Sequence, residues 1–245
     1  MDRFLVDEII DGRRAILSPA ESRHLLAVMR HTAGDEVEVR DGAGRRFRAR
    51  VAGREAGRAV VDLIEELCVP TQGLPEMTLA QAILKGKRMD LLVEKAVELG
   101  VRRIVPVVTQ RTVVRLDERF GQKRARWQRK IAGAVKQSGC AGAPELAEPV
   151  TFTDLLPTVA RYELACLAAL TSDAQPLARV LGAARDVRSL LFIVGPEGDF
   201  TLEELELARR TAGCRFVSLA PHVLRGETAA LVALAGALYE FGGRA

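Results

Sequence analysis

The sequence is poor in the residues on which several protein classes depend. Its 245 residues include four cysteines and three histidines, and no two cysteines form a CxxC pair. These features exclude a dense disulfide framework and the usual zinc spacings. No apolar run approaches the roughly 18 residues that a membrane span needs, and acids stand near the N-terminus where a signal peptide would be apolar. We expect a cytoplasmic protein with no metal and no membrane partner.

Common catalytic motifs are missing as well. The sequence has no HExxH motif and no GxSxG nucleophile elbow, which weakens hydrolase interpretations. It has no phosphate-binding GxxxxGK-Ser/Thr loop and no GxGxxG between a strand and a helix. The segment Gly42-Ala-Gly44 is better explained as a hairpin turn. The common nucleotide-binding folds are therefore not indicated.

The sequence does contain enough apolar residues for a core, and its charge is uneven. Hydrophobic residues make up 48% and charged residues 28% of the chain, so its length allows one large or two modest domains. The formal net charge is −1 over residues 1–70, +9 over 71–140 and −4 over 141–245. Positive charge gathered in one segment suggests a polyanionic partner such as RNA. A solvated basic helix is the alternative.

Residues 1–70 have the pattern of short strands joined by tight turns, which predicts a small β-barrel. Arg46, Arg48 and Arg50 share one face of a predicted strand, because side chains alternate. That face either tracks phosphates or is an ordinary solvent-facing one. A helix is expected to open at Ser18, whose side chain can cap it while Glu21 completes a capping box.

Prolines and a glycine interrupt the pattern between residues 69 and 75. We place a linker at 71–75, between a first domain at 1–70 and a second at 76–245. In the second domain apolar strands alternate with helices, which predicts an α/β fold with a parallel sheet covered on both faces. Strands are expected at 77–84, 104–108, 164–170, 190–194 and 215–219, and helices before 100, at 122–138, near 177–181, from 201 and at 227–241.

Two loops follow predicted strands, where an open α/β sheet binds its ligands. The first, Gly195-Pro-Glu-Gly-Asp-Phe200, has two glycines that allow a ligand close to the backbone. The second spans 220–229 and sets Arg225, Glu227 and Thr228 beside an apolar helix start, which is costly unless they have partners or a function. A plain tight turn and a buried structural ion pair are the respective alternatives.

Basic residues gather at two further strand ends, Lys85–Asp90 and Arg111–Arg115, and along the predicted helix at 122–138. Trp127 shares the spacing of the apolar stripe on that helix, so we expect it in the core rather than stacked on a base. Recognition of RNA through phosphate contacts and one extruded base fits this pattern.

Together these segments resemble the RsmE family, the 16S ribosomal RNA (uracil-N3)-methyltransferases of the SPOUT class. The resemblance rests on Gly195-Pro-Glu-Gly, Val223-Leu-Arg-Gly-Glu-Thr-Ala229 and the segment that begins Lys85-Gly-Lys-Arg-Met-Asp. His24-Leu-Leu-Ala-Val-Met-Arg30 matches the family's PUA-like RNA-binding barrel. The resemblance implies a deep trefoil knot in the second domain, S-adenosylmethionine as cofactor, a homodimer, and 16S ribosomal RNA or the small ribosomal subunit as partner.

The resemblance also implies roles for particular residues. Arg225 would steady negative charge on the uracil, and Glu197 or Glu227 would be the base. The cofactor would be held by Gly195, Pro196, Glu197, Gly198, Ser218, Leu219, Ala220, Val223, Leu224 and Thr228. RNA contacts are expected from Arg46, Arg48, Arg50, Lys85, Lys87, Arg88, Arg111, Arg115 and Gln137.

Three positions depart from the family pattern. Asp199 replaces a usual glycine, Gly226 a usual threonine and Cys140 a usual arginine. Two alternatives therefore stay open. One is a SPOUT methyltransferase acting on another RNA atom, such as a ribose 2′-hydroxyl, and the other is a non-catalytic RNA-binding factor in ribosome assembly.

Overall fold

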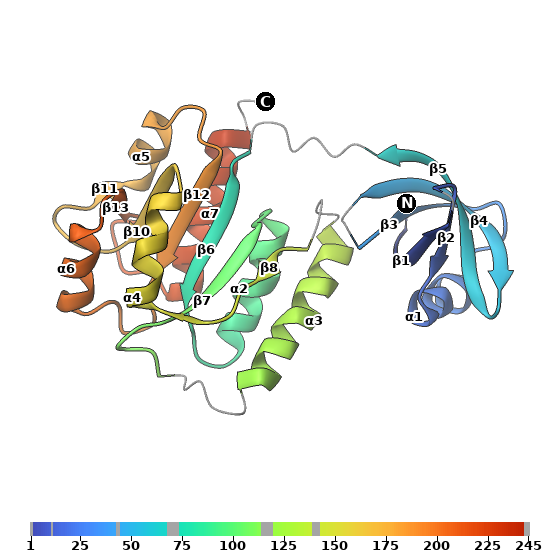
Figure 1. Ribbon diagram of the computed structural model, residues 1–245, viewed down its shortest axis with the longest axis horizontal. Helices are drawn as coiled ribbons and strands as arrows, with labels where there is room; N and C mark the ends of the chain where they lie inside the picture. Colours follow the sequence, from blue (N-terminus) through green and yellow to red (C-terminus); the bar gives the residue numbers. More distant parts are fainter. Residues whose placement is uncertain are drawn as a thin grey trace. The chain divides into compact units, whose positions relative to one another are not determined.

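The computed structural model describes residues 2–10, 12–42, 45–67, 74–113, 120–138 and 143–242. The chain forms two compact units (Figure 1). One, the barrel unit, contains Met1–Thr71 and Val135–Ala143, and the other, the sheet unit, contains Gln72–Ala134 and Pro144–Ala245. Each unit is described by itself.

The barrel unit is a closed barrel of five strands in the order β1-β2-β5-β4-β3. Neighbouring strands are antiparallel except where β1 pairs with β3 in parallel to close the barrel. Phe47, Ala49 and Val51 point into its core, as the alternation predicted. The strands are β1 (Arg3–Ile10), β2 (Arg14–Leu17), β3 (Glu36–Arg40), β4 (Arg46–Glu55) and β5 (Arg58–Leu67).

The helix of the barrel unit differs from the prediction. Helix α1 (Pro19–Arg23) runs into one π-helical turn, η1 (His24–Val28). Ser18 caps it by accepting a hydrogen bond from the Glu21 backbone N–H at 3.2 Å. The reciprocal half of the predicted capping box is wrong, because the Glu21 carboxylate instead accepts from the Lys136 ammonium at 2.6 Å and from a backbone N–H of β1. Charge pairing with a distant segment thus replaces the local contact.

The last turn of helix α3 (Phe120–Ser138) packs within the barrel unit. Its terminal carbonyl groups have no partner inside the helix. The Arg3 guanidinium donates to the Gln137 carbonyl at 3.0 Å, and Arg40 donates to the Val135 carbonyl at 3.4 Å. Two cations therefore stabilise the negative end of the helix dipole.

The sheet unit contains a sheet of eight described strands in the order β11-β13-β10-β12-β6-β7-β8, with β9 paired to β7. Every neighbouring pair is parallel. The strands are β6 (Glu76–Ala82), β7 (Arg103–Val108), β8 (Glu145–Leu146), β9 (Val150–Thr151), β10 (Leu164–Ala168), β11 (Gln175–Pro176), β12 (Ser189–Val194) and β13 (Cys214–Ser218). The five longer strands confirm the prediction. The two-residue strands were not predicted, because the alternation of side chains cannot be recognised in so short a segment.

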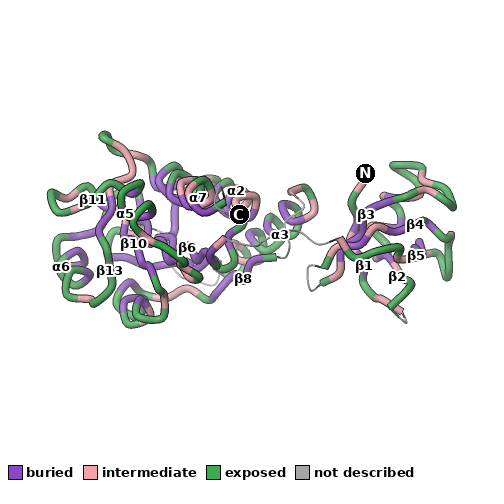
Figure 2. Tube along the Cα trace, turned by 90° about the horizontal axis from the view of Figure 1, so that it is seen from above, coloured by how far each residue is buried: buried purple, intermediate pink, exposed green. Residues whose placement is uncertain are grey.

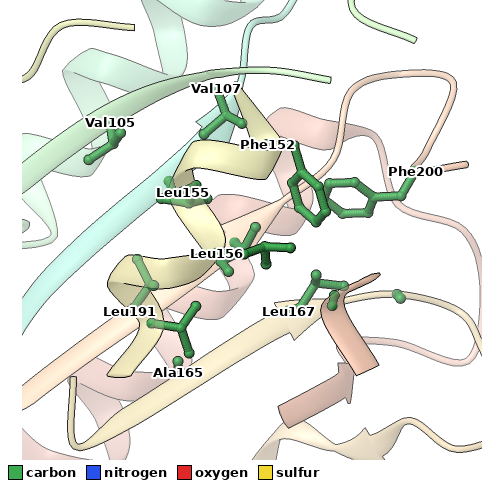
Figure 3. Packing of buried hydrophobic residues seen from close by; sticks show 14 of the residues in the cluster. Val105, Val107, Phe152, Leu155, Leu156, Ala165, Leu167, Leu191 and Phe200 are labelled. Carbon is green, nitrogen blue, oxygen red and sulfur yellow. The ribbon is translucent and has the colours of Figure 1, made fainter. Parts of the chain in front are cut away.

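Helices cover both faces of this sheet (Figure 1). One face packs against α2 (Lys87–Glu98), α5 (Leu177–Ala183) and α7 (Gly226–Gly242). The other packs against α4 (Phe152–Leu155), the 3-10 turn η2 (Leu156–Arg161) and α6 (Leu202–Arg210). Figure 3 shows the ring of Phe152 beside that of Phe200, and the two ring planes are tilted by 42°. Figure 2 shows buried segments in the strands of each unit and in the helices that cover the sheet.

Local sequence signals set the helix ends in the sheet unit. Thr201 and Glu204 form the predicted reciprocal capping box at the start of α6. Gly100 and Gly213 both have positive φ, which glycine adopts without strain. Trp127 is buried, and its indole N–H donates to Asp90 at 3.1 Å, which confirms it as a core residue.

The α/β fold with a parallel sheet and a small N-terminal barrel is confirmed. The trefoil knot and the domain limits at 71–75 stay predictions. Among the described residues, no helix has the length and hydropathy of a membrane span.

Candidate active site

A cavity of about 260 Å³ opens at the carboxyl ends of three adjacent strands of the sheet unit. Its walls come from Ala168–Leu170 after β10, from the loop that begins at Gly195 after β12, and from the loop after β13 that leads into α7. Parallel α/β sheets bind ligands at this edge. The sequence predicts the first of these segments as the end of a strand at 164–170, but β10 ends at Ala168. No role in the site was predicted for it.

The structure brings most of the predicted cofactor residues together around this cavity. Predicted residues in the lining are Gly195, Pro196, Glu197, Leu219, Ala220, Val223, Leu224 and Arg225. Gly198, Ser218, Glu227 and Thr228 lie outside the lining set. Arg88, predicted to contact RNA, also lines the cavity. Lining residues for which no role was predicted include Asp199, His222, Gly226 and Ala229.

Gly226 is closely packed at the start of α7. A Cβ at this position would lie 2.8 Å from Leu84 Cδ2 and 3.2 Å from the Gly195 carbonyl oxygen. The usual threonine would need both neighbours to shift. The glycine lets the helix start pack directly against the loop after β12.

Asp199 adopts a backbone conformation that glycine takes without strain. Its φ is +59°, a left-handed value that aspartate tolerates better than most residues. Its carboxylate accepts a hydrogen bond from the Phe200 N–H at 2.8 Å. The departure from the family pattern therefore preserves the turn.

Gln81 is a buried polar residue that sequence reasoning missed. It has no exposed surface, and its side-chain amide nitrogen lies 3.2 Å from the Gly195 carbonyl oxygen and 3.0 Å from that of Ala82. These contacts tie the end of β6 to the first residue of the cavity loop. A polar residue inside an apolar strand carried no periodic signal that could have marked it.

Glu197 is anchored by two donors. Its Oε1 accepts from the Lys85 backbone N–H and from the Arg88 guanidinium, each at 3.1 Å. Partial burial acts to raise the pKa of Glu197, but hydrogen bonds from its own backbone N–H and that of Lys85, with the charge of Arg88, outweigh it and lower the pKa. A carboxylate held this firmly in its charged form is a weak proton acceptor.

Glu227 has fewer partners for its carboxylate than Glu197 has. The residue is only 9% exposed, and its Oε1 lies 3.8 Å from Arg88 Nε. Its Oε2 is buried and makes no hydrogen bond within the described part of the chain. Buried carboxylate oxygens are normally hydrogen-bonded, so this atom has unused acceptor capacity.

Arg225 lies on the cavity wall with its side chain exposed. Neither a hydrogen bond nor an ion pair joins its guanidinium to any residue that the structure describes. A cation that is not neutralised by the protein is available to an anionic ligand. Within the described residues, Arg225 and Oε2 of Glu227 are thus two unpaired groups of opposite sign at the start of α7.

The three barrel arginines predicted to contact RNA are paired with carboxylates on neighbouring strands. Arg46 makes two hydrogen bonds to Glu38, each 2.6 Å long. Arg48 pairs with Glu65 and Arg50 with Glu36, each at 3.0 Å. Their face of β4 is therefore largely neutralised within the barrel unit.

The remaining predicted RNA residues have varied surroundings. The side chains of Lys85 and Lys87 are exposed. Arg111 donates to the Gly198 carbonyl at 2.6 Å. Gln137 accepts from Arg3 through its backbone carbonyl. Arg115 and Cys140 lie outside the described residues.

Other chemistries find little support in the described residues. No cluster of histidine, cysteine and carboxylate side chains there has the makings of a metal site. Burial raises the pKa of Cys166 to about 12 and that of Cys214 to about 11. Both thiols are thus protonated at neutral pH and poor nucleophiles.

Comparison with known proteins assigns this fold and cavity to a class. An RNA methyltransferase domain matches residues 72–237, and an RNA methyltransferase PUA domain matches residues 17–64. The first match spans more than half of the chain. The fold and the cavity at its strand ends therefore define an RNA methyltransferase.

Individual relatives narrow the class to one family. The chain is 35% identical to ribosomal RNA small subunit methyltransferase E of Mycobacterium tuberculosis, over 94% of this chain and 88% of the relative. It is 32% identical to the protein of that name from Synechocystis, over 94% of this chain and 74% of the relative. The chain belongs to the ribosomal RNA small subunit methyltransferase E family, which confirms the resemblance to RsmE.

A solved structure supports the same assignment. Ribosomal RNA small subunit methyltransferase E from Neisseria gonorrhoeae, bound to S-adenosyl methionine, is 29% identical to this chain. The two structures align with a TM-score of 0.81 over 98% of this chain and 97% of the other.

Proposed function

We propose that this protein transfers the methyl group of S-adenosylmethionine to N3 of a uridine in the 16S ribosomal RNA of the small subunit. The observation that carries the proposal is the pair of unused groups at the start of α7. The guanidinium of Arg225 lacks a partner among the described residues, and Oε2 of Glu227 lacks a donor there. The family supports the cofactor and the RNA substrate. The choice of atom rests on the chemistry below.

The cavity suits S-adenosylmethionine. Apolar side chains such as Leu170, Val217 and Leu219 can contact the faces of an adenine ring. Close packing of Gly226 on the Gly195 carbonyl keeps side chains away from the backbone, so that N–H and C=O groups can meet polar edges of a ligand. When bound, the cofactor supplies a methyl group on a positively charged sulfur that leaves readily as a thioether.

Most of the rate should come from orientation. Holding two reacting groups in line can lower a barrier by up to roughly 7–11 kcal/mol. The cavity loops are suited to this because they are tied down at their bases. Gln81 contacts the carbonyl of Gly195, and Glu197 is held by Lys85 and Arg88. These residues would hold the loop that contacts the cofactor in a fixed position.

The N3 proton of uracil must be removed as the new bond forms. Glu227 is the better candidate of the two glutamates, because its Oε2 has no donor among the described residues while Glu197 is committed to two donors. Arg88, shared between both carboxylates, would hold Glu227 in place through its Oε1. Glu227 would take the proton on Oε2.

Arg225 would stabilise the negative charge that develops on the uracil ring as the proton leaves. Its side chain is exposed on the cavity wall and has no ion pair to give up among the described residues. An electrostatic contact formed with the transition state contributes directly to the rate. A ribose 2′-hydroxyl as acceptor would place this charge on one oxygen instead of a planar ring.

Partners follow from the surfaces. We infer that Lys85 and Lys87 meet RNA phosphates, since both are exposed beside the cavity loops. We also infer a homodimer, because α7 is apolar on all sides and exposes Val232 and Tyr239. A cytoplasmic location fits both inferences.

Identification of the product tests the proposal. The purified protein is incubated with labelled S-adenosylmethionine and small ribosomal subunits that lack the modification, and the RNA is digested to nucleosides. We expect labelled 3-methyluridine, formed at least about 100-fold more slowly by the variant Arg225→Ala. A labelled 2′-O-methylnucleoside would overturn the choice of atom, and binding of RNA without cofactor binding would favour a non-catalytic assembly factor.

A further inference from the structure

We infer that Arg111 is a positioning residue for the cofactor loop, the segment Gly195–Phe200, and not a contact to RNA. The inference rests on the proposed cofactor site and deepens it. Arg111 lies in the loop after β7, two strands away from β12 in the sheet. It is absent from the cavity lining, so it acts through another residue.

The backbone around Arg111 is held by hydrogen bonds of the neighbouring residues. Thr109 and Thr112 close a turn around it, with the Thr112 N–H donating to the Thr109 carbonyl at 3.1 Å and the Thr109 N–H to the Thr112 hydroxyl at 2.9 Å. The neighbouring Gln110 N–H donates to the buried Glu204 carboxylate at 2.9 Å. A side chain on a rigid base loses less entropy when it makes a specific contact.

The side chain then meets the middle of the cofactor loop in two ways. Its Nη1 donates to the Gly198 carbonyl at 2.6 Å. Its aliphatic stem packs on the same residue, because a Cβ at Gly198 would lie 3.3 Å from Arg111 Cδ and 3.4 Å from its Cβ. A side chain at this position would crowd the stem. The polar contact and the packing contact therefore depend on each other.

Gly198 stands between two residues of the cavity wall, Glu197 and Asp199. On one side, Glu197 is tied to Lys85 in the loop after β6 and to Arg88 in the first turn of α2. On the other, Arg111 ties Gly198 to the loop after β7. The loop is thus clamped from two sides. Releasing the second clamp should let the wall of the cavity move and weaken cofactor binding.

The experiment measures binding of S-adenosylmethionine by calorimetry in the absence of RNA. Arg111→Met keeps the stem but loses the donor, and we expect its Kd to rise about 3- to 10-fold, the effect of one hydrogen bond. Arg111→Lys keeps a donor and should restore binding to within about 2-fold. Arg179→Met, an exposed arginine on α5, is the matched control and should bind like the parent.

Two further readouts separate positioning from other roles. In a methyl transfer assay, Arg111→Met should raise KM for the cofactor while kcat at saturating cofactor stays near the parent value. In combination with Gly198→Ala, which crowds the stem, its effect should be less than additive, because both changes act on one contact.

A different pattern of binding would assign Arg111 to RNA. If Arg111→Met binds the cofactor like the parent but binds RNA more weakly, with a salt dependence lower by about one phosphate contact, Arg111 is an RNA residue and the inference is wrong. Failure of the parent chain itself to bind S-adenosylmethionine would overturn the proposed function rather than this inference alone.

Discussion

Two pairs of arginines, one pair in each unit, have contrasting surroundings. In the barrel unit, Arg46 and Arg50 are paired with carboxylates on the neighbouring strand β3. In the sheet unit, Arg225 has no partner among the described residues, and Arg111 binds a backbone carbonyl. Arg46 and Arg50 thus stabilise the barrel itself, while Arg225, unpaired within the described residues, is available to a ligand and Arg111 holds a loop of the site. Positive charge in the sequence does not by itself mark a nucleic-acid contact.

The largest expected effect is that of substituting Glu227, whose Oε2 accepts no hydrogen bond among the described residues. Glu227→Gln keeps the shape of the side chain but removes its basicity, so kcat should fall by about 10²- to 10⁴-fold. Single-turnover assays at saturating cofactor and RNA would measure it. The matched change Glu197→Gln should act mainly on cofactor KM, since Glu197 anchors the loop. A larger loss of kcat with Glu197→Gln would show that Glu197, and not Glu227, acts as the base.

Arg225→Ala should lower methyl transfer to bound RNA by about 10²- to 10³-fold, because a charge aimed at the transition state is lost. The melting temperature should hardly change, since Arg225 has no ion pair to lose within the described residues. Arg225→Lys keeps the charge and should recover part of the rate. Unchanged turnover by Arg225→Ala would end its electrostatic role.

Arg46→Met should destabilise the barrel by about 2 kcal/mol, because it leaves the buried Glu38 without its two strongest hydrogen bonds. Denaturant unfolding measures this change. Arg50→Met removes an exposed pair and should cost under about 1 kcal/mol. If the two variants were equally stable and both bound RNA poorly, the barrel arginines would serve RNA and the contrast between the units would fail.

The smallest expected effect is a pH dependence of barrel stability. Burial acts to raise the pKa of Glu38, but the hydrogen bond and charge of Arg46 outweigh it and lower the pKa. A carboxyl whose pKa is lowered by folding stabilises the folded state above its ordinary pKa, and that stabilisation is lost as the pH falls through the folded value. Unfolding measured between about pH 6 and 3 should therefore show a loss that Glu38→Gln reduces. An identical acid limb in the variant would exclude this source.

The fold was predictable because its signals are local. Apolar runs such as Leu190–Val194 and the capping box at Thr201 depend on neighbours in the sequence, and both are confirmed. Glu21 was misread because its carboxylate is taken by Lys136, more than a hundred residues away. Charge partners across strands depend on register, which periodicity does not encode.

The candidate site likewise contains residues that local sequence signals reveal and residues that they do not. Gly195 and the loop after β13 were found because glycines and polar residues follow apolar strands. Ala168–Leu170 was missed because its residues carry no chemistry of their own and gain a role from position alone. Gln81 and Arg111 act through backbone atoms of the cofactor loop, and no motif records such contacts.

The most direct test of the central claim is the identity of the methylated nucleoside that the protein forms in unmodified small subunits. The account predicts 3-methyluridine in 16S ribosomal RNA, formed by the parent chain and reduced by at least about 100-fold in Glu227→Gln. A different methylated nucleoside, or 3-methyluridine formed at the parent rate by that variant, would contradict it.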